Sequence, residues 1–186
     1  MTMRSEGFEG LREYLAAYEK DPTLAVVPVP LVAEYFGITA PSVTARLRSA
    51  KLDGLRIGRQ SFVLISSIVK LQKSQQAEIR TVEEILIYNA KNQCRIVFYE
   101  PIMTPIGLKT DIPWDRKRIG EILGDISRNS HKAHNVLLSV LVHRSKSGAT
   151  QPGKGFFELA AELGYDVDDE RKFVTEETER VLRTYA

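Results

Sequence analysis

The stretch Leu31-Val-Ala-Glu-Tyr-Phe-Gly-Ile-Thr-Ala-Pro-Ser-Val-Thr-Ala-Arg-Leu-Arg-Ser49 decides the fold of the first part of this chain. Its apolar residues recur at helical spacing up to Gly37. Pro30 suits the first turn of that helix, because an N–H at this position has no partner within the helix. Gly37 is expected to end the helix, since glycine adopts a left-handed conformation without steric cost.

A second helix is expected directly after this corner. Thr39 can cap it by accepting a backbone N–H, and Pro41 fits its first turn. Val43 and Leu47 lie four residues apart and are expected to face the first helix. The residues left toward solvent are Ala40, Ser42, Thr44, Ala45, Arg46 and Arg48.

Two β-rich runs follow the second helix, Leu55 to Ile57 and Phe62 to Ile65. The segment Gly58-Arg59-Gln60-Ser61 separates them, which predicts a hairpin with glycine at its turn and a cation at its tip. Two short helices joined at a tight corner can present the second helix to the major groove of DNA. The pattern therefore favours a DNA-binding module.

In this order of elements, residues 31–71 resemble the excisionase and MerR-type DNA-binding domains of bacteria and phages, which are winged helix-turn-helix modules. The likeness rests on a hydrophobic first helix, a glycine corner, a second helix ending near a basic residue, and a hairpin containing Arg56-Ile-Gly-Arg59. The resemblance implies that Ser42, Thr44 and Arg46 meet bases or phosphates. It also implies that Arg56, Arg59 and Gln60 meet the DNA backbone or the minor groove. The competing interpretation is a small helical domain with a solvated polar surface.

Charge is unevenly distributed along the chain, although its net value is only +2. Residues 25–75 hold seven basic and two acidic residues, net +5, whereas residues 156–186 hold four basic and nine acidic residues, net −5. A locally basic module attracts phosphate without making the whole protein adhere to polyanions. Arg46, Arg48, Arg56 and Arg59 are therefore expected to dominate docking by contacting phosphates.

Composition is that of an ordinary globular protein of 186 residues, 43% of them hydrophobic. This length allows one domain of usual size or two small ones. Cys94 is the single cysteine, so no intramolecular disulfide can form, and we expect a buried structural thiol. No secretory signal and no apolar run of about 18 residues is present, which predicts a cytoplasmic protein without a membrane partner.

The fold class expected is α+β, mainly α with short β hairpins, in which the N-terminal winged helix-turn-helix precedes a small α+β domain. The boundaries expected are an amphipathic helix in 1–24, the winged module in 25–75, a helical linker in 76–92 and the C-terminal domain in 93–186.

A helix after Ser66 or Ser67 carries an apolar stripe at helical spacing, formed by Ile68, Leu71, Ile79, Val82 and Leu86. Thr81 and Glu84 match a capping box, which favours a break near Arg80. A continuous helix could instead pair with a twin and form a dimer. We expect a homodimer for a separate reason, because one helix-turn-helix touches few base pairs.

Within the second half, Ile96 to Tyr99 and Asn135 to Val142 read as strands, and Asp115 to Asn129 as a helix. Two further helices are expected at Phe156 to Leu163 and Asp169 to Tyr185.

The motifs Tyr99 to Met103, Ile119 to Gly124, Leu141 to Arg144, Ser147-Gly148 and Pro152 to Phe157 are similar in order to the C-terminal domain of alkylguanine-DNA alkyltransferases. His143 and Arg144 fall on that family's histidine and arginine. Val142 replaces its acceptor cysteine, so alkyl transfer is excluded. The run 137–142 and the Pro-Gly-x-Gly-Phe-Phe loop also resemble an uncharacterised bacterial domain.

No catalytic residue, cofactor or metal site is assigned from the sequence. His131 and His134 have a spacing that could hold a metal, but no third ligand is apparent. His143 with Asp115 or Asp125 could form a base and its orienting acid. Gly153-Lys154-Gly155 could cradle an anion, so Arg144 and Lys154 are possible DNA or phosphate contacts of the second domain.

The function expected is binding of double-stranded DNA, as a bacterial or phage transcriptional regulator rather than an enzyme. Two alternatives remain: an excisionase-like architectural factor that bends DNA for recombination, and a nuclease or base-modifying enzyme that uses the first module for targeting.

Overall fold

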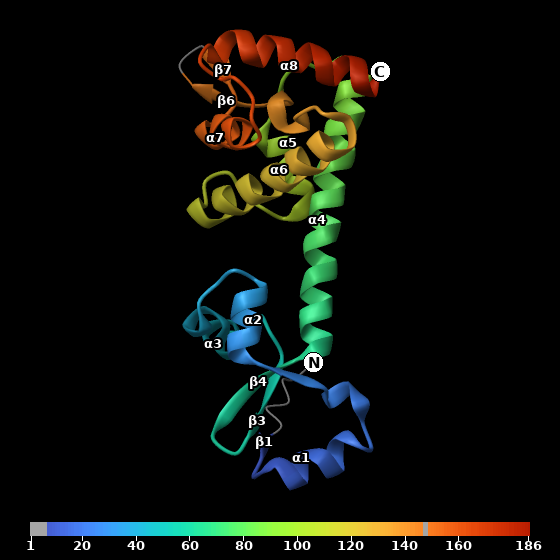
Figure 1. The fold of residues 1–186 in the computed structure, drawn as a ribbon, viewed down its shortest axis with the longest axis vertical. Coiled ribbons are helices and arrows are strands. Elements are labelled where there is room, and N and C mark those ends of the chain that lie inside the picture. Colours follow the sequence, from blue (N-terminus) through green and yellow to red (C-terminus); the bar gives the residue numbers. More distant parts are fainter. Residues whose placement is uncertain (1–6, 147–148) are drawn as a thin grey trace. The chain divides into compact units, whose positions relative to one another are not determined.

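The computed structural model describes residues 7–146 and 149–186, and Figure 1 shows their course. The chain has an α+β fold in which helices dominate and the strands form two small sheets. The pattern of residue contacts divides it into two units, Met1–Gln75 and Gln76–Ala186. Each unit has a hydrophobic core of its own.

The sheet of the first unit has the order β1-β3-β4-β2. Strands β3 (Gly54–Ile57) and β4 (Gln60–Leu64) form a hairpin, so the turn contains two residues, Gly58-Arg59, rather than the four expected. Gly58 has a φ of +58° at the position where type II′ turns take glycine. Strand β1 (Gly7–Phe8) pairs in parallel with β3, and β2 (Val26–Pro28) pairs antiparallel with β4.

The corner between α2 and α3 forms as its sequence predicts. Gly37 has a φ of +59°, its N–H donates to Glu34 O at 3.1 Å, and the N–H of Ile38 donates to Ala33 O at 2.9 Å. This pair of hydrogen bonds is the Schellman motif that closes a helix. Thr39 Oγ1 then accepts the N–H of Ser42 and caps the next helix. The helical segments of the unit before Gly54 are α1 (Leu11–Tyr18), the 3-10 turn η1 (Pro22–Leu24), α2 (Val29–Tyr35) and α3 (Ala40–Arg48).

The core of the first unit holds α2 and α3 against the hairpin. Val43 is fully buried, and Leu47 packs on the same cluster, as expected from their spacing. Gly54 makes this packing possible, because a Cβ there would lie 2.3 Å from Phe62 O and 2.6 Å from Leu47 Cδ2. The buried residues of this cluster are Val32, Ala33, Val43, Leu52 and Val63.

Helix α1, at Leu11–Tyr18, occupies only part of the segment 1–24 in which an amphipathic helix is predicted. Residues 7 and 8 form β1 instead, because Phe8 O accepts the N–H of Gly58 at 2.8 Å and the pairing with β3 begins there. Tyr14 is the buried residue of α1 and donates its hydroxyl to Leu24 O at 3.1 Å. Three large apolar residues of this helix are exposed: Leu11, Leu15 and Tyr18.

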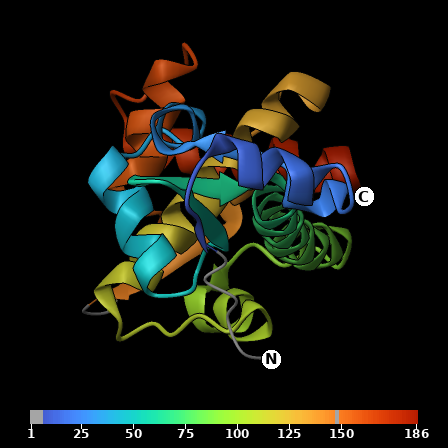
Figure 2. The same cartoon turned by 90° about the horizontal axis from the view of Figure 1, so that it is seen from below.

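Helix α4 (Ile65–Lys91) is continuous, so the break predicted near Arg80 is wrong. Figure 1 draws it as one unbroken coil, and Figure 2 views it nearly end-on. Glu84 does not complete a capping box with Thr81 but pairs with Arg80 Nε at 2.9 Å, four residues earlier. Ser67 does not cap the helix either, because α4 begins two residues earlier, at Ile65. The hydroxyl of Ser67 instead accepts the N–H of Asp53 at 2.8 Å.

The apolar stripe of α4 is used within the chain. Ile68 and Leu71 pack on the core of the first unit. Val82 and Leu86 are fully buried in the core of the second unit, and Ile79 packs against it. The dimer seam that a continuous helix could have offered is therefore occupied by intramolecular packing.

Cys94 is exposed, so the expectation of a buried structural thiol is wrong. It follows Gln93, whose φ of +58° ends α4, and its N–H donates to Asn89 O at 2.9 Å. The neighbouring strand β5 begins only at Val97, after this exposed corner.

The second unit combines a small sheet of order β5-β6-β7 with helices. Strand β5 (Val97–Phe98) is parallel to β6 (Val142–Lys146), and β6 is antiparallel to β7 (Ala149–Gln151). The helical segments of this unit after α4 are α5 (Tyr99–Met103), η2 (Thr104–Ile106), α6 (Pro113–His134), η3 (Leu138–Leu141), α7 (Lys154–Glu162) and α8 (Glu170–Tyr185).

The strand predicted over residues 135–142 is wrong, because residues 138–141 form the 3-10 turn η3. Side chains take the backbone N–H groups that a strand would have used. Ser130 Oγ accepts from Leu138 N at 3.1 Å and Ser127 Oγ from Ser139 N at 3.2 Å. The segment is nevertheless the centre of the second core, since Leu137, Leu138, Val140 and Leu141 are all fully buried.

Among residues 7–146 and 149–186, no helix combines the length and the apolar character needed to cross a membrane.

Candidate nucleic-acid interface

Helix α3 has one buried and one exposed face. Since successive residues turn by about 100° around a helix, Ala45 lies at the middle of the face opposite Val43 and Leu47. Ala45 is exposed, and its methyl group is small enough to allow a close approach by another surface. Among the predicted outward residues, Ala40, Thr44 and Arg46 are half-buried rather than exposed. The exposed residues that surround Ala45 are Pro41, Ser42, Arg48 and Ser49.

The two hydroxyls predicted to read bases are partly occupied by the helix. Thr44 Oγ1 donates to Ala40 O at 3.1 Å, so only its lone pairs remain for a ligand. Ser42 Oγ lies 2.9 Å from Thr39 Oγ1, the group that caps the helix. Thr44 can therefore accept from an amino group, such as those of adenine and cytosine, but cannot donate to a carbonyl without breaking its own hydrogen bond.

Helix α3 and the hairpin carry four arginines whose guanidinium groups have no fixed partner in the described part of the chain. Within the described ranges, no hydrogen bond or ion pair involves the guanidinium of Arg46, Arg48, Arg56 or Arg59. Arg48, Arg56 and Arg59 are exposed. Their donors are therefore available to an external anion.

The hairpin sets the directions of its polar residues. Successive side chains of a strand point to opposite faces. Leu55 is buried, at 4% exposed, so its neighbour Arg56 points to the opposite, exposed face of β3. Arg59 occupies the second position of the turn, and Gln60 opens β4 opposite Ile57. All three predicted polar contacts of the hairpin, Arg56, Arg59 and Gln60, are exposed.

The acidic residues nearest in sequence do not neutralise these arginines. Glu34 on α2 and Asp53 before β3 are exposed, and neither forms an ion pair with an arginine in the described part of the chain. The first unit as a whole has ten basic and seven acidic residues, net +3, against sixteen and seventeen, net −1, in the second. The basic excess thus lies in the unit that carries α3.

The two second-unit cations predicted to bind phosphate are differently placed. Lys154 Nζ lies 2.9 Å from Glu158 Oε1, so its charge is already paired on the surface of α7. This hydrogen bond, followed by the charge of Glu158, raises the pKa of Lys154. Arg144 lies over the ring of Tyr99, at 5.9 Å from the centroid, and against the backbone of Gly153. A methyl group at Gly153 would lie 3.1 Å from Arg144 Nε.

His143 is not available as a catalytic base. Only 5% of the residue is exposed, and its Nε2 lies 3.1 Å from Val140 O. The Nδ1 atom is buried without a hydrogen-bond partner in the described part of the chain. Burial lowers the pKa of His143, an effect that backbone groups of Thr150 and Val140 partly oppose. The imidazole is therefore neutral at pH 7.

Neither carboxylate predicted to orient His143 contacts it. Asp115 accepts the N–H of Lys109 at 2.9 Å, and Asp125 lies 3.8 Å from Arg128. Val142, the residue at the alkyltransferase acceptor position, begins β6 and is 2% exposed. His143, Asp115, Asp125 and Val142 therefore do not form a contacting set of nucleophile, base and acid.

His131 and His134 do not converge on a common point. His131 Nδ1 lies 2.9 Å from the hydroxyl of Tyr165, while the ring of His134 packs on the edge of Tyr185. Among residues 7–146 and 149–186, no group of three or more His, Cys, Asp or Glu side chains is placed to hold a metal ion.

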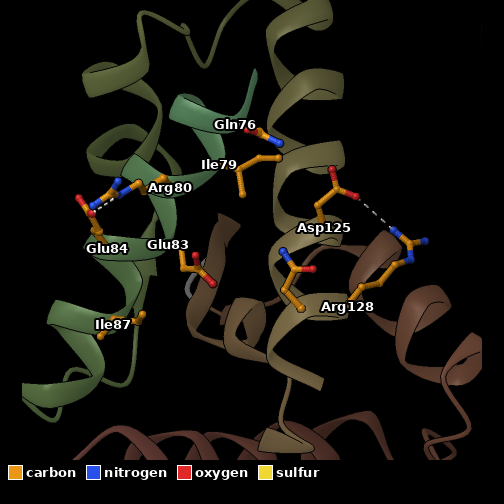
Figure 3. A pocket seen from close by; sticks show the side chains of 9 residues that line it. Gln76, Ile79, Arg80, Glu83, Glu84, Ile87, Asp125 and Arg128 are labelled. Atoms are coloured by element: carbon orange, nitrogen blue, oxygen red, sulfur yellow. Dashed lines mark hydrogen bonds and ion pairs between the residues drawn. The ribbon is translucent and has the colours of Figure 1, made fainter. Parts of the chain in front are cut away.

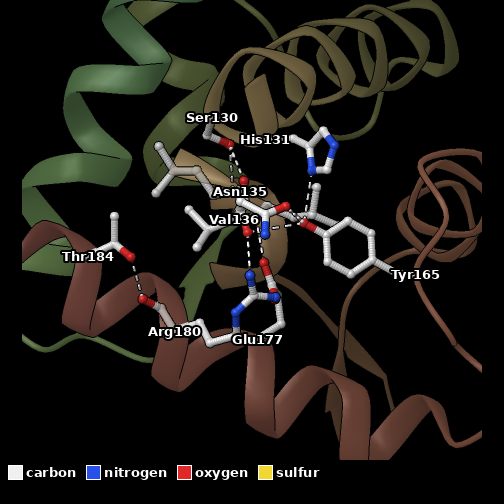
Figure 4. Close-up of polar contacts among 10 residues, drawn as sticks. Ser130, His131, Asn135, Val136, Tyr165, Glu177, Arg180 and Thr184 are labelled. Carbon is white, nitrogen blue, oxygen red and sulfur yellow. Dashed lines mark hydrogen bonds and ion pairs between the residues drawn. The ribbon is translucent and has the colours of Figure 1, made fainter. Parts of the chain in front are cut away.

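A buried carboxylate, Glu177, organises the turn before η3, and Figure 4 shows its contacts. Glu177 Oε1 accepts the N–H of Leu137 at 2.6 Å, and Oε2 accepts from Arg180 Nη1 at 2.6 Å. Arg180 also donates to Asn135 O, and the hydroxyl of Tyr165 reaches the same carbonyl at 3.2 Å. Burial raises the pKa of Glu177, while the Leu137 N–H and then Arg180 act to lower it. The cluster fixes α8 to the turn.

A cleft of about 650 Å³ lies between α4 and α6 in the second unit (Figure 3). Its two arginines are paired: Arg80 with Glu84 at 2.9 Å, and Arg128 with Asp125 at 3.8 Å and Glu162 at 3.5 Å. Because its cations are neutralised in this way, the cleft lacks the free positive charge of an anion site. Its lining residues are Gln76, Ile79, Arg80, Glu83, Glu84, Ile87, Asp125, Arg128 and Asn129.

Two features of the interface were not assigned by the sequence. The central position of Ala45 follows from helical periodicity, but its neutral methyl group gave no chemical signal. The hydrogen bonds of Ser42 and Thr44 depend on side-chain rotamers, which spacing does not specify. The chain matches no protein-family model, no curated protein and no solved structure.

Proposed function

We propose that residues 25–75 form a winged helix-turn-helix that binds double-stranded DNA, with α3 in the major groove and the β3–β4 hairpin as the wing. The observation that carries this proposal is the set of four arginines on α3 and the hairpin without an internal partner among the described residues. A guanidinium held in an ion pair would lose that pair on binding phosphate, whereas these four keep their donors free.

The small centre of the α3 face supports insertion into a groove. The major groove is about 12 Å wide and admits a helix whose side chains do not block close approach. Ala45 provides such a centre, and Arg46 and Arg48 flank it. The hydroxyl lone pairs of Thr44 add a limited base contact, so phosphate binding dominates affinity.

The proposed role is transcriptional regulation, with the second unit supplying dimerisation, partner contact or sensing. The second unit has a hydrophobic core of some twenty buried residues, which is typical of a separate domain and supports a function of its own. An excisionase-like role would use the same α3 and hairpin to bend DNA. The two roles differ in a measurable property, the bend angle of the bound duplex.

The test is a gel shift with a labelled duplex taken from the promoter region of the protein's own gene, repeated at increasing salt concentrations. Arg46→Ala with Arg59→Ala should weaken binding by at least about tenfold and should reduce the dependence of affinity on salt. Arg12→Ala is the control, because Arg12 is exposed like Arg59 and lies on α1. Unchanged affinity of the double variant would refute the proposal. A strongly bent duplex in the same complex would favour the excisionase-like role.

A further inference from the structure

The single tryptophan of the chain is presented to solvent on the first turn of α6. Trp114 is 65% exposed, and Ile112, directly before the helix, is 39% exposed. The indole forms no hydrogen bond within the described ranges. The core of the second unit takes its aromatic side chains from elsewhere: Phe156, Phe157 and Phe173.

The backbone around Trp114 is held in place by its neighbours. Asp115 Oδ2 accepts the N–H of Lys109 at 2.9 Å, which ties the preceding loop to the helix. Arg116 Nη1 donates to Thr110 O at 3.0 Å and to Asp111 O at 3.3 Å. A ring on such a fixed turn loses little further freedom when a ligand packs on it.

One cation lies over the ring. Lys117 Nζ lies 5.5 Å from the centroid of the Trp114 ring, within the range of a cation–π interaction. No carboxylate pairs with Lys117 in the described part of the chain. The segment 109–117 has three basic and two acidic residues, and the carboxylate of Asp115 is already engaged by the loop. This turn is therefore locally positive in a unit of net charge −1.

We propose that Trp114 is a stacking platform for an unpaired base of single-stranded nucleic acid, with Lys117 contacting an adjacent phosphate. Aromatic side chains bordered by cations suit such a ligand, because every base offers a π-face and every nucleotide a negative charge. The site belongs to the second unit, whereas α3 belongs to the first, and it does not require the proposed duplex binding.

The small size of the apolar patch argues for a base rather than a protein partner. A stable protein interface buries about 800 Å² on each side. Trp114 can contribute about 150–250 Å² of this area, and the residues directly before it, Ile112 and Pro113, are its exposed apolar neighbours in the chain. One base stack needs only the ring.

Intrinsic tryptophan fluorescence tests the proposal directly, because Trp114 is the single tryptophan in the sequence and is the source of the whole signal. The full chain is titrated with an oligothymidylate of about 20 nucleotides, which is longer than one binding site and cannot form a duplex. We expect saturable quenching whose midpoint moves to higher concentration as salt rises. Lys117→Gln should raise the midpoint a few-fold. Absence of quenching at low salt would overturn the proposal.

Variants separate base stacking from general apolar contact. Binding of labelled oligothymidylate to Trp114→Leu should weaken by about 5- to 150-fold, whereas Trp114→Phe, which keeps a π-face, should lose less. Tyr88→Leu is the control, since Tyr88 is 69% exposed and has no cation over its ring within the described ranges. Equal affinity of Trp114→Leu and the unchanged chain would overturn the assignment. The exposed turn would then be better explained as a contact site for a protein partner.

Discussion

At the scale of single residues, Ala50 is one of the described non-glycine residues that adopt a left-handed backbone conformation. It ends α3 with a φ of +59°, and the N–H of Lys51 donates to Arg46 O at 2.9 Å. A left-handed conformation costs a residue with a Cβ about 1–2 kcal/mol. Ala50→Gly is therefore expected to stabilise the first unit by about 0.5–1 kcal/mol in urea unfolding, after the greater chain entropy of glycine is subtracted.

Ala45→Gly is the matched control, because Ala45 is an exposed residue inside the same helix. Glycine at that position should destabilise the helix by about 0.5–1 kcal/mol. Equal destabilisation by the two substitutions would show that Ala50 carries no strain.

His143 gives a prediction about pH, because burial lowers its pKa in the folded protein. When the pH falls below the ordinary histidine pKa of about 6.5, the imidazole is protonated in the unfolded chain but stays neutral in the folded protein. Stability from this group is thus complete above that pH and is lost as the pH falls toward the folded pKa, at no more than about 1.4 kcal/mol per pH unit.

The measurement is the free energy of unfolding between about pH 7 and pH 5. His143→Gln removes the titration and keeps an amide donor for Val140 O, so its free energy should depend less steeply on pH than that of the unchanged chain. Identical slopes would indicate that His143 reaches solvent in the folded state.

Local signals were sufficient for the residues whose roles depend on near neighbours. Gly37 and Thr39 could be assigned from the sequence, because the Schellman motif and the N-cap involve residues within a few positions. The role of Glu177 could not be assigned, since its partner Leu137 is 40 residues away. Charge alone gave no indication that this carboxylate would be buried.

At the scale of elements, the approach of α3 to the hairpin depends on Gly54. A Cβ there would lie 2.3 Å from the backbone oxygen of Phe62, which cannot move without disturbing β4. Gly54→Ala is expected to cost about 2 kcal/mol or more in urea unfolding.

Gly10→Ala is the control, because nothing lies within 4 Å of a Cβ at that position and its backbone is extended. A change within about 0.5 kcal/mol is expected for it. Should Gly54→Ala prove equally mild, the close packing of α3 on β4 would be in doubt.

Elements were predicted correctly where one pattern acted alone. The β3–β4 hairpin and α3 followed from glycine, proline and apolar spacing. In α4, the box of Thr81 and Glu84 suggested a start, but both residues lie inside a helix stabilised by packing at both ends. Residues 138–141 have strand-like composition, yet the serine hydroxyls of α6 hold their backbone in a 3-10 turn.

At the scale of the whole molecule, the apolar stripe of α4 contributes residues to the cores of both units. Leu86 is fully buried in the core of the second unit. Leu86→Ala is therefore expected to cost about 2–5 kcal/mol, through lost burial and the cavity left behind. The unfolding midpoint should shift by the same amount at every protein concentration.

A coiled-coil seam would behave differently, because the stability of a dimer increases with concentration. A midpoint of Leu86→Ala that moves with protein concentration would thus contradict the intramolecular assignment. Lys91→Ala, at the exposed last turn of α4, provides a control that should leave the midpoint nearly unchanged.

The exposure of Cys94 also affects how association should be studied. A lone thiol at the surface can be oxidised to a covalent link between two copies, whatever the affinity of their folded surfaces. In air-exposed samples, such crosslinked material would imitate a genuine dimer on a sizing column. Adding a reductant, or measuring the Cys94→Ser variant, prevents this disulfide, so that the association measured is reversible self-association alone.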